Sequence, residues 1–544
     1  MNINFENDNL VSEDINENVD FFTKNIISSA KISIPKSSPQ LHKKSVSWWN
    51  EEIKMLIFLK VNCLRKYKRT GKLEHFVEFL KSKSKVRRVI REEKRKTWIN
   101  FLETINSKTP SSMIFDKIRQ LSGKYRSSVV KILKENDQLI TDSRKICECL
   151  ANSFENISSS SNYSKNFINY KNQIERDTLI IPLNNDESYN HPITIEELLQ
   201  TLAECKGSSP GPDEIHYEMI QNLCINGKNF LIKIFNQIWL NHVFPENWKR
   251  SIMIAVLKPG KDPRIPTNYR PISLTNCLCK VLERIINKRL VWFLEEGNCF
   301  SDFQSGFRKN RCTLDNLLFL EHHIMKTFCE KKYLVSIFFD IEKAYDTTWR
   351  RYIIAELIRM GLKGNLVFFI KNFFSERFFK IGNGNNFSSE RKMENGIVQG
   401  SIISVTCFLI VINTIFQIID LPVKKIMFAD DLAIFVDGNS FEDIRHKLQL
   451  SLYKLEEWSN KSGLRFSETK TVAMCFTRKY LVPTFPDLFL NGIKIKFAEQ
   501  HKFLGMFLDP KLKWVTHLKY IKSKAARNLN LIKMLSQHKI GSDR

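Results

Sequence analysis

Apolar positions recur at helical spacing in a long segment that begins near Trp48 and continues to about Ile105. The segment contains no proline and a single glycine. The apolar residues that fall three, four or six positions apart are Leu56, Leu59, Cys63, Tyr67, Leu73, Phe76 and Leu80. This pattern predicts a helical arm, which we assign to residues 46–110.

A different pattern marks the second half of the chain. Residues 333–339 are almost all aliphatic or aromatic and predict a buried strand. Residues 424–428 and 432–436 flank Ala429-Asp430-Asp431 and predict two strands joined by a tight turn. A capped amphipathic helix is expected between Ser440 and Gly463. Because strands and helices mix without regular βαβ alternation, the predicted fold class is α+β.

Other segments show little periodicity. Residues 1–45 are acidic and rich in Asn, and we expect them to be disordered. Residues 111–190 include the serine run Ser158–Ser161 and are expected to form an irregular linker region. The longest apolar stretch, from Ile402 to Ile419, is interrupted by polar residues and predicts a buried helix, not a membrane span.

The net charge of the chain indicates which class of partner it binds. The 544 residues include 84 Lys and Arg against 58 Asp and Glu, a net charge of +26. This excess favours a polyanion, either nucleic acid or an anionic membrane surface. Between Lys54 and Trp98 there are 16 cations and 4 acids, so the helical arm is expected to contact phosphates, although a solvated charged face would show the same composition. A membrane surface is disfavoured because the arm lacks a clean apolar face.

Cysteine usage and the N-terminus point to the cell interior. The twelve Cys have no disulfide-framework spacing and form no C-x-x-C zinc motif. The first residues have neither a basic start nor an apolar core, so no secretory signal is expected. We therefore expect a location in the nucleus and cytoplasm.

Acidic residues occur where the expected strands end. Asp340 follows the 333–339 strand, and Asp430 and Asp431 form the hairpin tip ninety residues later. Acids beside such apolar runs are costly unless they are paired. Carboxylates that converge there would bind hard divalent cations, as in two-metal phosphoryl transfer. An Asp-Asp pair alone is weak evidence, because most such pairs are exposed turns.

An ordered series of blocks around these acids resembles the reverse transcriptases of non-LTR retrotransposons, and in particular the jockey-like lineage of insect elements. In chain order the blocks are Lys258–Asp262 (KPGKD), Asn268–Leu274 (NYRPISL), Gln304–Arg308 (QSGFR), Phe339–Asp346 (FDIEKAYD), Gly396–Ser401 (GIVQGS), Phe428–Asp431 (FADD), Gly463–Thr471 and Phe503–Gly505 (FLG). They span roughly residues 195–520.

The resemblance implies a right-hand polymerase, with fingers at 191–330, palm at 331–495, the start of a thumb at 496–544, and a reverse transcriptase domain at about 238–510. It also implies an RNA-directed DNA polymerase that extends a DNA 3′-hydroxyl on an RNA template. Deoxynucleoside triphosphates, a DNA primer and the retrotransposon RNA would be its partners, and two Mg²⁺ ions, with Mn²⁺ as an alternative, its cofactors.

The same resemblance assigns roles around the acids. Asp340 and Asp430 correspond to metal ligands, with the Ile341 carbonyl beside them and Asp431 completing the cluster. Lys470 corresponds to the lysine that protonates the leaving pyrophosphate, although an exposed loop lysine is an equal alternative.

Further residues are implied to contact the nucleotide and the nucleic acids. Tyr345 would block a 2′-hydroxyl, the alternative being a core aromatic. The other expected nucleotide-binding residues are Lys261, Arg270, Gln399 and Gly400. The expected primer grip is Phe503, Leu504 and Gly505. The expected nucleic-acid-binding cations are Arg65, Lys66, Lys68, Arg69, Arg87, Arg88, Arg308 and Arg311.

The sequence departs from the family pattern in one block. Val398 and Val405 stand where the family has prolines, which puts the rigidity of the nucleotide pocket in doubt. An inactive relic that only binds RNA is therefore one alternative, and a maturase-like splicing factor is another. No endonuclease pattern precedes residue 46, so we expect a piece of a longer polyprotein.

Overall fold

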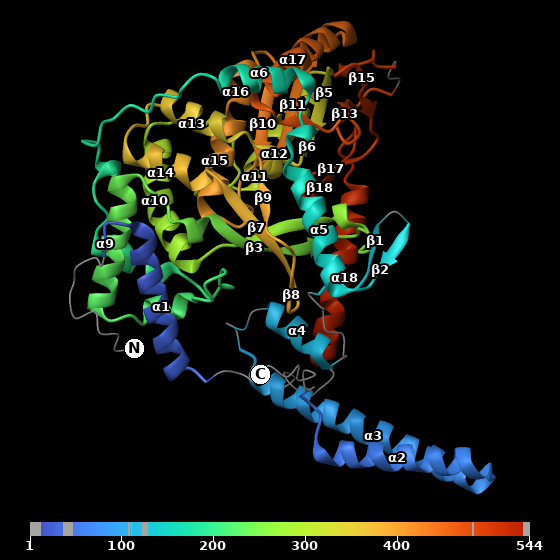
Figure 1. Ribbon diagram of the computed structural model, residues 1–544. Coiled ribbons are helices and arrows are strands. Elements are labelled where there is room, and N and C mark those ends of the chain that lie inside the picture. The colour runs from blue at the N-terminus through green and yellow to red at the C-terminus, as the bar shows by residue number, and fades with distance from the viewer. Residues whose placement is uncertain are drawn as a thin grey trace. The chain divides into compact units, whose positions relative to one another are not determined.

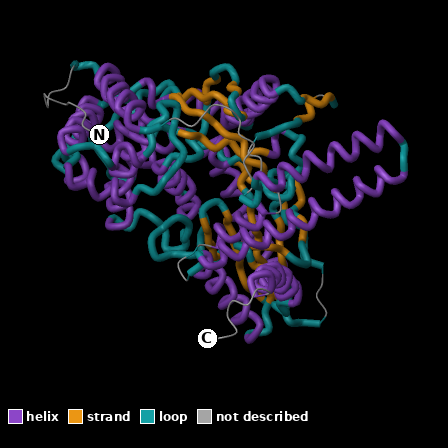
Figure 2. Tube along the Cα trace, turned by 90° about the horizontal axis from the view of Figure 1, so that it is seen from below, coloured by secondary structure: helices purple, strands orange, loops and turns teal. Residues whose placement is uncertain are grey.

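The computed structural model describes residues 12–35, 47–106, 109, 111–121, 129–135, 137–480 and 484–536 (Figures 1 and 2). The chain divides into two compact units. The larger comprises Met1–Pro35 and Ser128–His517, and the smaller comprises Lys36–Ser127 and Leu518–Arg544. The larger unit mixes helices with two five-stranded sheets, which confirms the α+β class.

The central sheet of the larger unit contains the strands that the apolar runs predict. Its order is β10 (Lys424–Phe428), β11 (Asp431–Gly438), β5 (Tyr333–Phe339), β13 (Val472–Phe476) and β16 (Lys496–Phe497). All neighbours are antiparallel except β13 and β16. The expected helix is also confirmed: α17 (Phe441–Ser462) begins after Ser440, whose side chain accepts from Asp443 N, and ends at Gly463 with φ of 79°.

Strand β5 is apolar except for Ser336 because both faces of the sheet are covered. Val335, Ile337 and Phe339 join the main core. Leu334 and Phe338 point to the opposite face, where they pack against α11 (Thr313–Cys329). Alternate residues of a strand face opposite sides, so a continuous apolar run is what a doubly covered strand requires.

The main core is built from helices around this sheet. The predicted buried helix appears as α15 (Ile402–Asn413), followed by α16 (Ile415–Ile418). Helices α10 (Cys277–Glu296) and α13 (Arg350–Arg359) pack against α15, and α14 (Asn365–Phe374) packs against α13. The short helix α12 (Ala344–Thr347) contacts α15 through Tyr345 and Phe408. Within the described residues, no helix is both long and apolar enough to cross a membrane.

A second sheet has the order β4 (Tyr269–Leu274), β3 (Arg250–Leu257), β7 (Arg377–Asn383) and β8 (Asn386–Phe387), and β9 (Arg391–Met393) pairs with β7. Helix α5 (Ser143–Ser158) packs on this sheet. Its residues Leu150 and Phe154 share a core with Met253 and Phe379.

The expected disorder of residues 1–45 is wrong for residues 15–33, which form α1 (Ile15–Ser33). Ile15, Phe22 and Ile26 are buried on one side of this helix. Phe22 stacks on Phe230 of α9 (Ile225–Asn241), with ring centroids 5.8 Å apart. Polar residues of this helix also contact the body of the unit: Asn18 Nδ2 donates to Gln237 Oε1 at 2.9 Å, and Asn16 Oδ1 accepts from Glu246 N at 2.9 Å. Residues 1–11 and 36–45 lie outside the described residues.

The expectation of an irregular region at 111–190 is also wrong over most of its length. It contains α4 (Ser111–Leu121), β1 (Leu133–Glu135), β2 (Gln138–Ile140), α5 and α6 (Lys165–Ile174). Phe167 of α6 contacts Trp349, with ring centroids 5.4 Å apart. The serine run is an ordered turn, in which Ser160 N donates to Glu394 Oε2 at 3.1 Å. Local polarity misled the prediction because distant partners order these residues.

The smaller unit contains the predicted helical arm. Helices α2 (Glu51–Thr70) and α3 (Leu73–Glu103) lie side by side as a hairpin (Figures 1 and 2). Gly71, with φ of 66°, ends the first helix. Ile53, Leu56, Val86 and Val89 form the small core between the two helices. Near the C-terminal end the chain forms one more long helix, α18 (Val515–Ser536).

The remaining elements are short. They are α7 (Ile195–Glu204), α8 (Tyr217–Gln221), β6 (Ile341–Glu342), β12 (Arg465–Phe466), β14 (Phe489–Leu490), β15 (Ile493–Lys494), β17 (His501–Phe503), β18 (Met506–Leu508) and the 3-10 turns at Ser160–Asn162, Ser188–Asn190, Glu246–Lys249 and Pro266–Asn268.

Candidate active site

Three carboxylates gather at one end of the central sheet. Asp340 follows the last residue of β5, Asp430 lies in the turn between β10 and β11, and Asp431 is the first residue of β11. Because Leu432 pairs with Phe339, the next residues along these two antiparallel strands are Asp431 and Asp340. The register of the sheet therefore brings together the three acids that the sequence singled out.

These acids repel one another. The pKa of Asp431 is raised to about 6, first by loss of hydration and then by the charges of Asp430 and Asp340. Loss of hydration and the charge of Asp340 also raise the pKa of Asp430, while Arg270 opposes that rise. Both side chains remain open to solvent at their tips. A cation at this place would relieve the repulsion.

The oxygen ligands at this place suit a hard divalent ion whose coordination is completed by the substrate. Among the described residues, no three His, Cys, Asp or Glu side chains stand close enough to hold a metal ion by themselves. The expected set of Asp340, Ile341, Asp430 and Asp431 is therefore not a preformed cage. Mg²⁺ is usually held by one or two carboxylates together with substrate phosphates and water, and carboxylate oxygens are ligands of that kind.

Lys470 lies directly beside this cluster. Its Nζ donates to Asp340 Oδ2 at 2.8 Å. The loop that carries it is fixed by a backbone bond from Ser467 N to Asp340 O, at 2.7 Å. The Lys470 side chain is 65% exposed and that of Asp340 is 42% exposed, so this ion pair contributes little to stability. A substrate could displace it without a large cost.

A buried amide holds the turn that carries Asp430. Gln304 Oε1 accepts hydrogen bonds from Ala429 N at 3.1 Å and from Gly306 N at 2.9 Å. Gln304 Nε2 donates to Ala429 O at 3.3 Å, and Ser305 N donates to Met427 O at 3.0 Å. Gln304 is fully buried. Gln304 belongs to the QSGFR block, but the sequence did not identify it as a site residue. The only sign of its role in the sequence is an amide side chain between two structured segments.

Tyr345 stands next to the acids. Its ring stacks on Phe408 with centroids 4.8 Å apart and an interplanar angle of 25°. Burial, and then the charge of Asp430, raises the pKa of Tyr345 to about 12. The tyrosine is therefore packed against Phe408 and lies close enough to Asp430 to be influenced by its charge.

The Gln399-Gly400 loop approaches strand β4. Ser273 N donates to Gln399 O at 2.7 Å. Gly400 has φ of 122°, and a Cβ atom there would lie 2.6 Å from Ser273 O, so only glycine fits.

The two valines that replace family prolines do not disturb the start of α15. Ser401 caps this helix by accepting from Ser404 N at 3.4 Å. Ile402 N also donates to the buried Glu283, at 3.0 Å. Val398 is buried before the turn and Val405 lies inside the helix. Capping side chains thus satisfy the N-terminal N–H groups that a proline would partly remove.

Cations from the second sheet gather near the same place. The pKa of Lys258 is lowered by burial and then by the charges of Arg270, Lys470 and Lys261. Arg270 and Lys261 are exposed. Neither side chain forms an ion pair with another residue that the structure describes. Lys258 was quoted in its motif, yet sequence reasoning did not single it out.

The Phe503-Leu504-Gly505 segment is the tip of the β17–β18 hairpin. Leu504 and Gly505 have φ of 46° and 87°, as a two-residue hairpin turn requires. Phe503 is buried against Phe338, with ring centroids 5.0 Å apart. Packing therefore fixes Phe503, and Gly505 is the exposed residue of the tip.

The expected nucleic-acid-binding arginines differ in their surroundings. Arg308 is only 9% exposed, and its Nη2 donates to Glu295 Oε2 at 2.6 Å. Arg311 pairs with Asp302 at 2.9 Å near the surface. The cations of the helical arm, by contrast, are exposed, namely Arg65, Lys66, Lys68, Arg69, Arg87 and Arg88. The structure thus uses Arg308 for internal contacts, and we omit it from the proposed interface.

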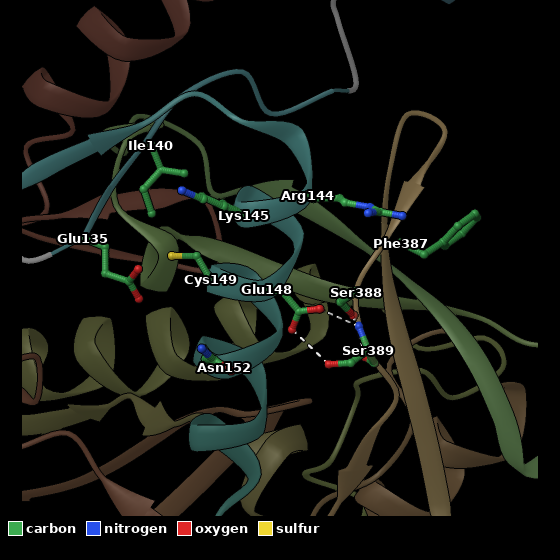
Figure 3. Close-up of a pocket in the computed structure, with 10 residues that line it drawn as sticks. All are labelled: Glu135, Ile140, Arg144, Lys145, Glu148, Cys149, Asn152, Phe387, Ser388 and Ser389. Atoms are coloured by element: carbon green, nitrogen blue, oxygen red, sulfur yellow. Dashed lines mark hydrogen bonds between the residues drawn. The ribbon is translucent and has the colours of Figure 1, made fainter.

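A cavity of about 540 Å³ lies elsewhere, between α5 and the β7–β8 hairpin (Figure 3). Glu148 at its edge accepts from Ser389 N at 2.6 Å. Burial raises the pKa of the Cys149 thiol to about 11, which keeps it protonated and unreactive near neutral pH. The cavity contains none of the residues described above.

Comparisons with known proteins agree with the motifs. Residues 256–508 match the family model described as "Reverse transcriptase (RNA-dependent DNA polymerase)". The "Probable RNA-directed DNA polymerase from transposon BS" of Drosophila melanogaster is 28% identical over 356 residues, which cover 64% of this chain and 39% of that protein. The "RNA-directed DNA polymerase from mobile element jockey" of Drosophila funebris is 28% identical over 334 residues, or 60% of this chain and 36% of that protein.

The chain thus spans less than two fifths of the length of these relatives where they align. Among solved structures, apo telomerase from Candida tropicalis covers 54% of this chain and 66% of its own, with 11% identity and a TM-score of 0.33.

Proposed function

We propose that the chain is a reverse transcriptase of the non-LTR retrotransposon type, as its similarity to that family supports, and that it extends the 3′-hydroxyl of a DNA primer on an RNA template. The substrates are deoxynucleoside triphosphates, and the natural template is the retrotransposon RNA. The observation that chiefly supports this proposal is the meeting of Asp340, Asp430 and Asp431 at one sheet end, with Tyr345 beside them.

In this proposal the central sheet belongs to the palm, strands β3 and β4 of the second sheet to the fingers and α18 to the start of the thumb. Asp340 and Asp430, with the Ile341 carbonyl and Asp431, would hold Mg²⁺ or Mn²⁺, which supplies Lewis-acid stabilisation of the transferred phosphoryl group. The carboxylates also set the site's negative charge, which the nearby cations balance.

The cations have separate tasks. Lys258, Lys261 and Arg270 bind the triphosphate, for which the guanidinium offers two parallel donors. Lys470 carries a proton close to the acids and delivers it to the leaving pyrophosphate. Its hydrogen bond to Asp340 holds the Lys470 side chain beside the acids before substrate binds.

A direct assay tests the proposal. The purified chain, given poly(rA), an oligo(dT) primer, dTTP and Mg²⁺, is expected to lengthen the primer. A chain that binds the RNA but never extends the primer would instead support the inactive RNA-binding relic.

Tyr345→Val is expected to raise ribonucleotide incorporation more than it lowers deoxynucleotide incorporation. The substitution removes the ring that stacks on Phe408 and, in the proposed site, opens space where the sugar of the nucleotide would lie. The measurement is the ratio of dGTP to rGTP efficiencies, kcat/KM for each, and we expect it to fall at least tenfold, equivalent to about 1.4 kcal/mol. Tyr345→Phe is the matched control, because it keeps the ring, and an unchanged ratio for Tyr345→Val would leave Tyr345 as a packing residue.

The helical arm is expected to carry much of the salt-dependent RNA affinity. Deleting residues 47–106 spares α1, which belongs to the main core. Each phosphate contact contributes about −0.7 to −0.9 to the slope of log K against log salt concentration. The sharper variant combines Arg65→Gln, Arg69→Gln and Arg87→Gln, which should flatten the slope by about two units while turnover on saturating template persists.

The control for the arm replaces three lysines that pair with acids around α17, namely Lys447→Gln, Lys454→Gln and Lys461→Gln. This variant removes the same formal charge and should leave the slope nearly unchanged. Equal slopes for the arm variant and the parent would place the arm away from nucleic acid.

A further inference from the structure

Asp346 connects two parts of the proposed nucleotide site. It lies on the short helix α12, one residue after Tyr345, and is partly buried. Its Oδ1 accepts a hydrogen bond from Gln399 Nε2 at 2.7 Å. The backbone oxygen of Gln399 is held as well, by Ser273 N at 2.7 Å. Gln399 is therefore anchored through both its main chain and its side chain.

This hydrogen bond settles which way the Gln399 amide points. An ionised carboxylate only accepts hydrogen bonds, so it must face the NH₂ group of the amide. The carbonyl oxygen Oε1 is then directed away from Asp346. No donor among the residues that the structure describes is recorded for this oxygen, so it remains available as an acceptor.

The charge of Asp346 is suited to this task. Burial raises the pKa of Asp346 to about 6, and the Gln399 hydrogen bond, Lys258 and Lys343 all favour its ionised form. At neutral pH the group is thus mainly ionised, as a carboxylate acceptor must be. The short distance of 2.7 Å is typical of a charge-assisted hydrogen bond.

Backbone bonds already join the two segments that Asp346 connects. Ile397 N donates to Tyr345 O at 2.8 Å, and Gly396 N donates to Thr348 O at 3.1 Å. Arg350 adds a bond from its Nε to Gly396 O at 2.8 Å. Because these contacts already hold the loop, the specific role of the Asp346 carboxylate is to orient the Gln399 side chain.

We propose that Asp346 is a positioning residue, which holds the Gln399 amide so that its free oxygen accepts a hydrogen bond from the incoming nucleotide. This inference rests on the proposed function. It assigns Asp346 no contact with the nucleotide, and its effect on nucleotide affinity passes entirely through Gln399.

A double-mutant cycle tests this dependence. The variants are Asp346→Ala, Gln399→Ala and the combination of both. The readouts are the Kd of dTTP for the enzyme bound to a dideoxy-terminated primer on poly(rA), and the KM and kcat of single-nucleotide addition. Each single variant should weaken dTTP binding about tenfold, with the loss in KM and not in kcat. The double variant should be no weaker than Gln399→Ala.

Two conservative changes provide rescue. Asp346→Asn keeps an acceptor and should bind dTTP within about threefold of the parent. Gln399→Glu places a second carboxylate against Asp346 and should weaken binding, because like charges would meet where a hydrogen bond was. Adding Asp346→Asn to Gln399→Glu should restore binding, since the new amide can donate to the new carboxylate. The comparison of Gln399→Glu with the Gln399→Glu, Asp346→Asn double variant keeps the test decisive if thermal unfolding shows that Asp346→Ala does not fold.

Additive losses of about a hundredfold in the double variant, or normal binding by Asp346→Ala, would overturn the inference. So would a Gln399→Glu defect that Asp346→Asn does not relieve. A parent chain that never extends a primer contradicts the proposed function instead, so the two failures are distinct.

Discussion

Asp430→Ala should reduce primer extension by several orders of magnitude and leave RNA affinity within about twofold of the parent. The substitution removes one of the three carboxylates at the end of the central sheet and no phosphate-binding cation. Loss of a metal-assisted contribution of several kcal/mol corresponds to several decades of rate, at about 1.4 kcal/mol for each decade. Single-nucleotide addition and RNA binding at a fixed salt concentration are the two measurements.

Asp437→Asn is the matched control for this experiment. Asp437 lies on β11, the strand that begins directly after Asp430, but near its far end, where it pairs with Lys424 at 3.7 Å. It should extend primers at the parent rate. If Asp430→Ala also polymerises within tenfold of the parent, the assignment of the carboxylates to metal binding is wrong.

Local pattern was sufficient to predict β5, β10 and β11, three of the five strands of the central sheet. The run from Tyr333 to Phe339 is apolar on both faces and is ended by an acid, so its boundaries could be read directly. The helix between Ser440 and Gly463 carries its own start and stop signals. The sequence signals for such elements lie within the elements themselves or directly beside them.

Helix α1 shows why other elements were missed. Its buried stripe is interrupted by Asn and acidic residues, and its partner α9 lies about two hundred residues further along the chain. Burial against that partner stabilises a helix that its own composition does not mark. The same reason applies to α6, whose Phe167 is buried against Trp349.

The candidate site likewise contains residues that the sequence predicts and residues that only the folded structure reveals. The family motifs located Asp340, Asp430, Lys470 and Tyr345, which the structure brings together. They did not identify Gln304 as a site residue, because its bond to Ala429 spans 125 residues of sequence and depends on the folded chain.

Arg308 shows the opposite error. A motif position predicts that a residue type matters, but not whether it serves a ligand or the protein itself. The guanidinium of Arg308 is occupied by Glu295 and the Ser301 carbonyl.

The second large loss of primer extension is expected from a substitution at Gly306, which has no side-chain functional group. Gly306 lies against the turn that presents Asp430, and a Cβ atom added there would be 2.1 Å from Ala429 N and 2.7 Å from Ala429 Cα. Both atoms belong to the backbone, so no side chain can rotate away to make room. Because Gln304 also bonds both Gly306 N and Ala429 N, the two segments can separate only by losing these hydrogen bonds.

Gly306→Ala should therefore displace the Asp430 turn and lower primer extension at least about a hundredfold, the cost expected for a displacement of roughly 1 Å in a reacting group. The overpacking itself should destabilise the fold by only about 1–3 kcal/mol, so the variant should still unfold cooperatively and bind RNA. Gly207→Ala is the control, since the one atom near its added Cβ is the flexible Glu218 carboxylate at 3.2 Å, and it should act within twofold of the parent. Normal extension by Gly306→Ala would mean that the turn can move without consequence, and Gln304 would then be a core residue with no part in placing Asp430.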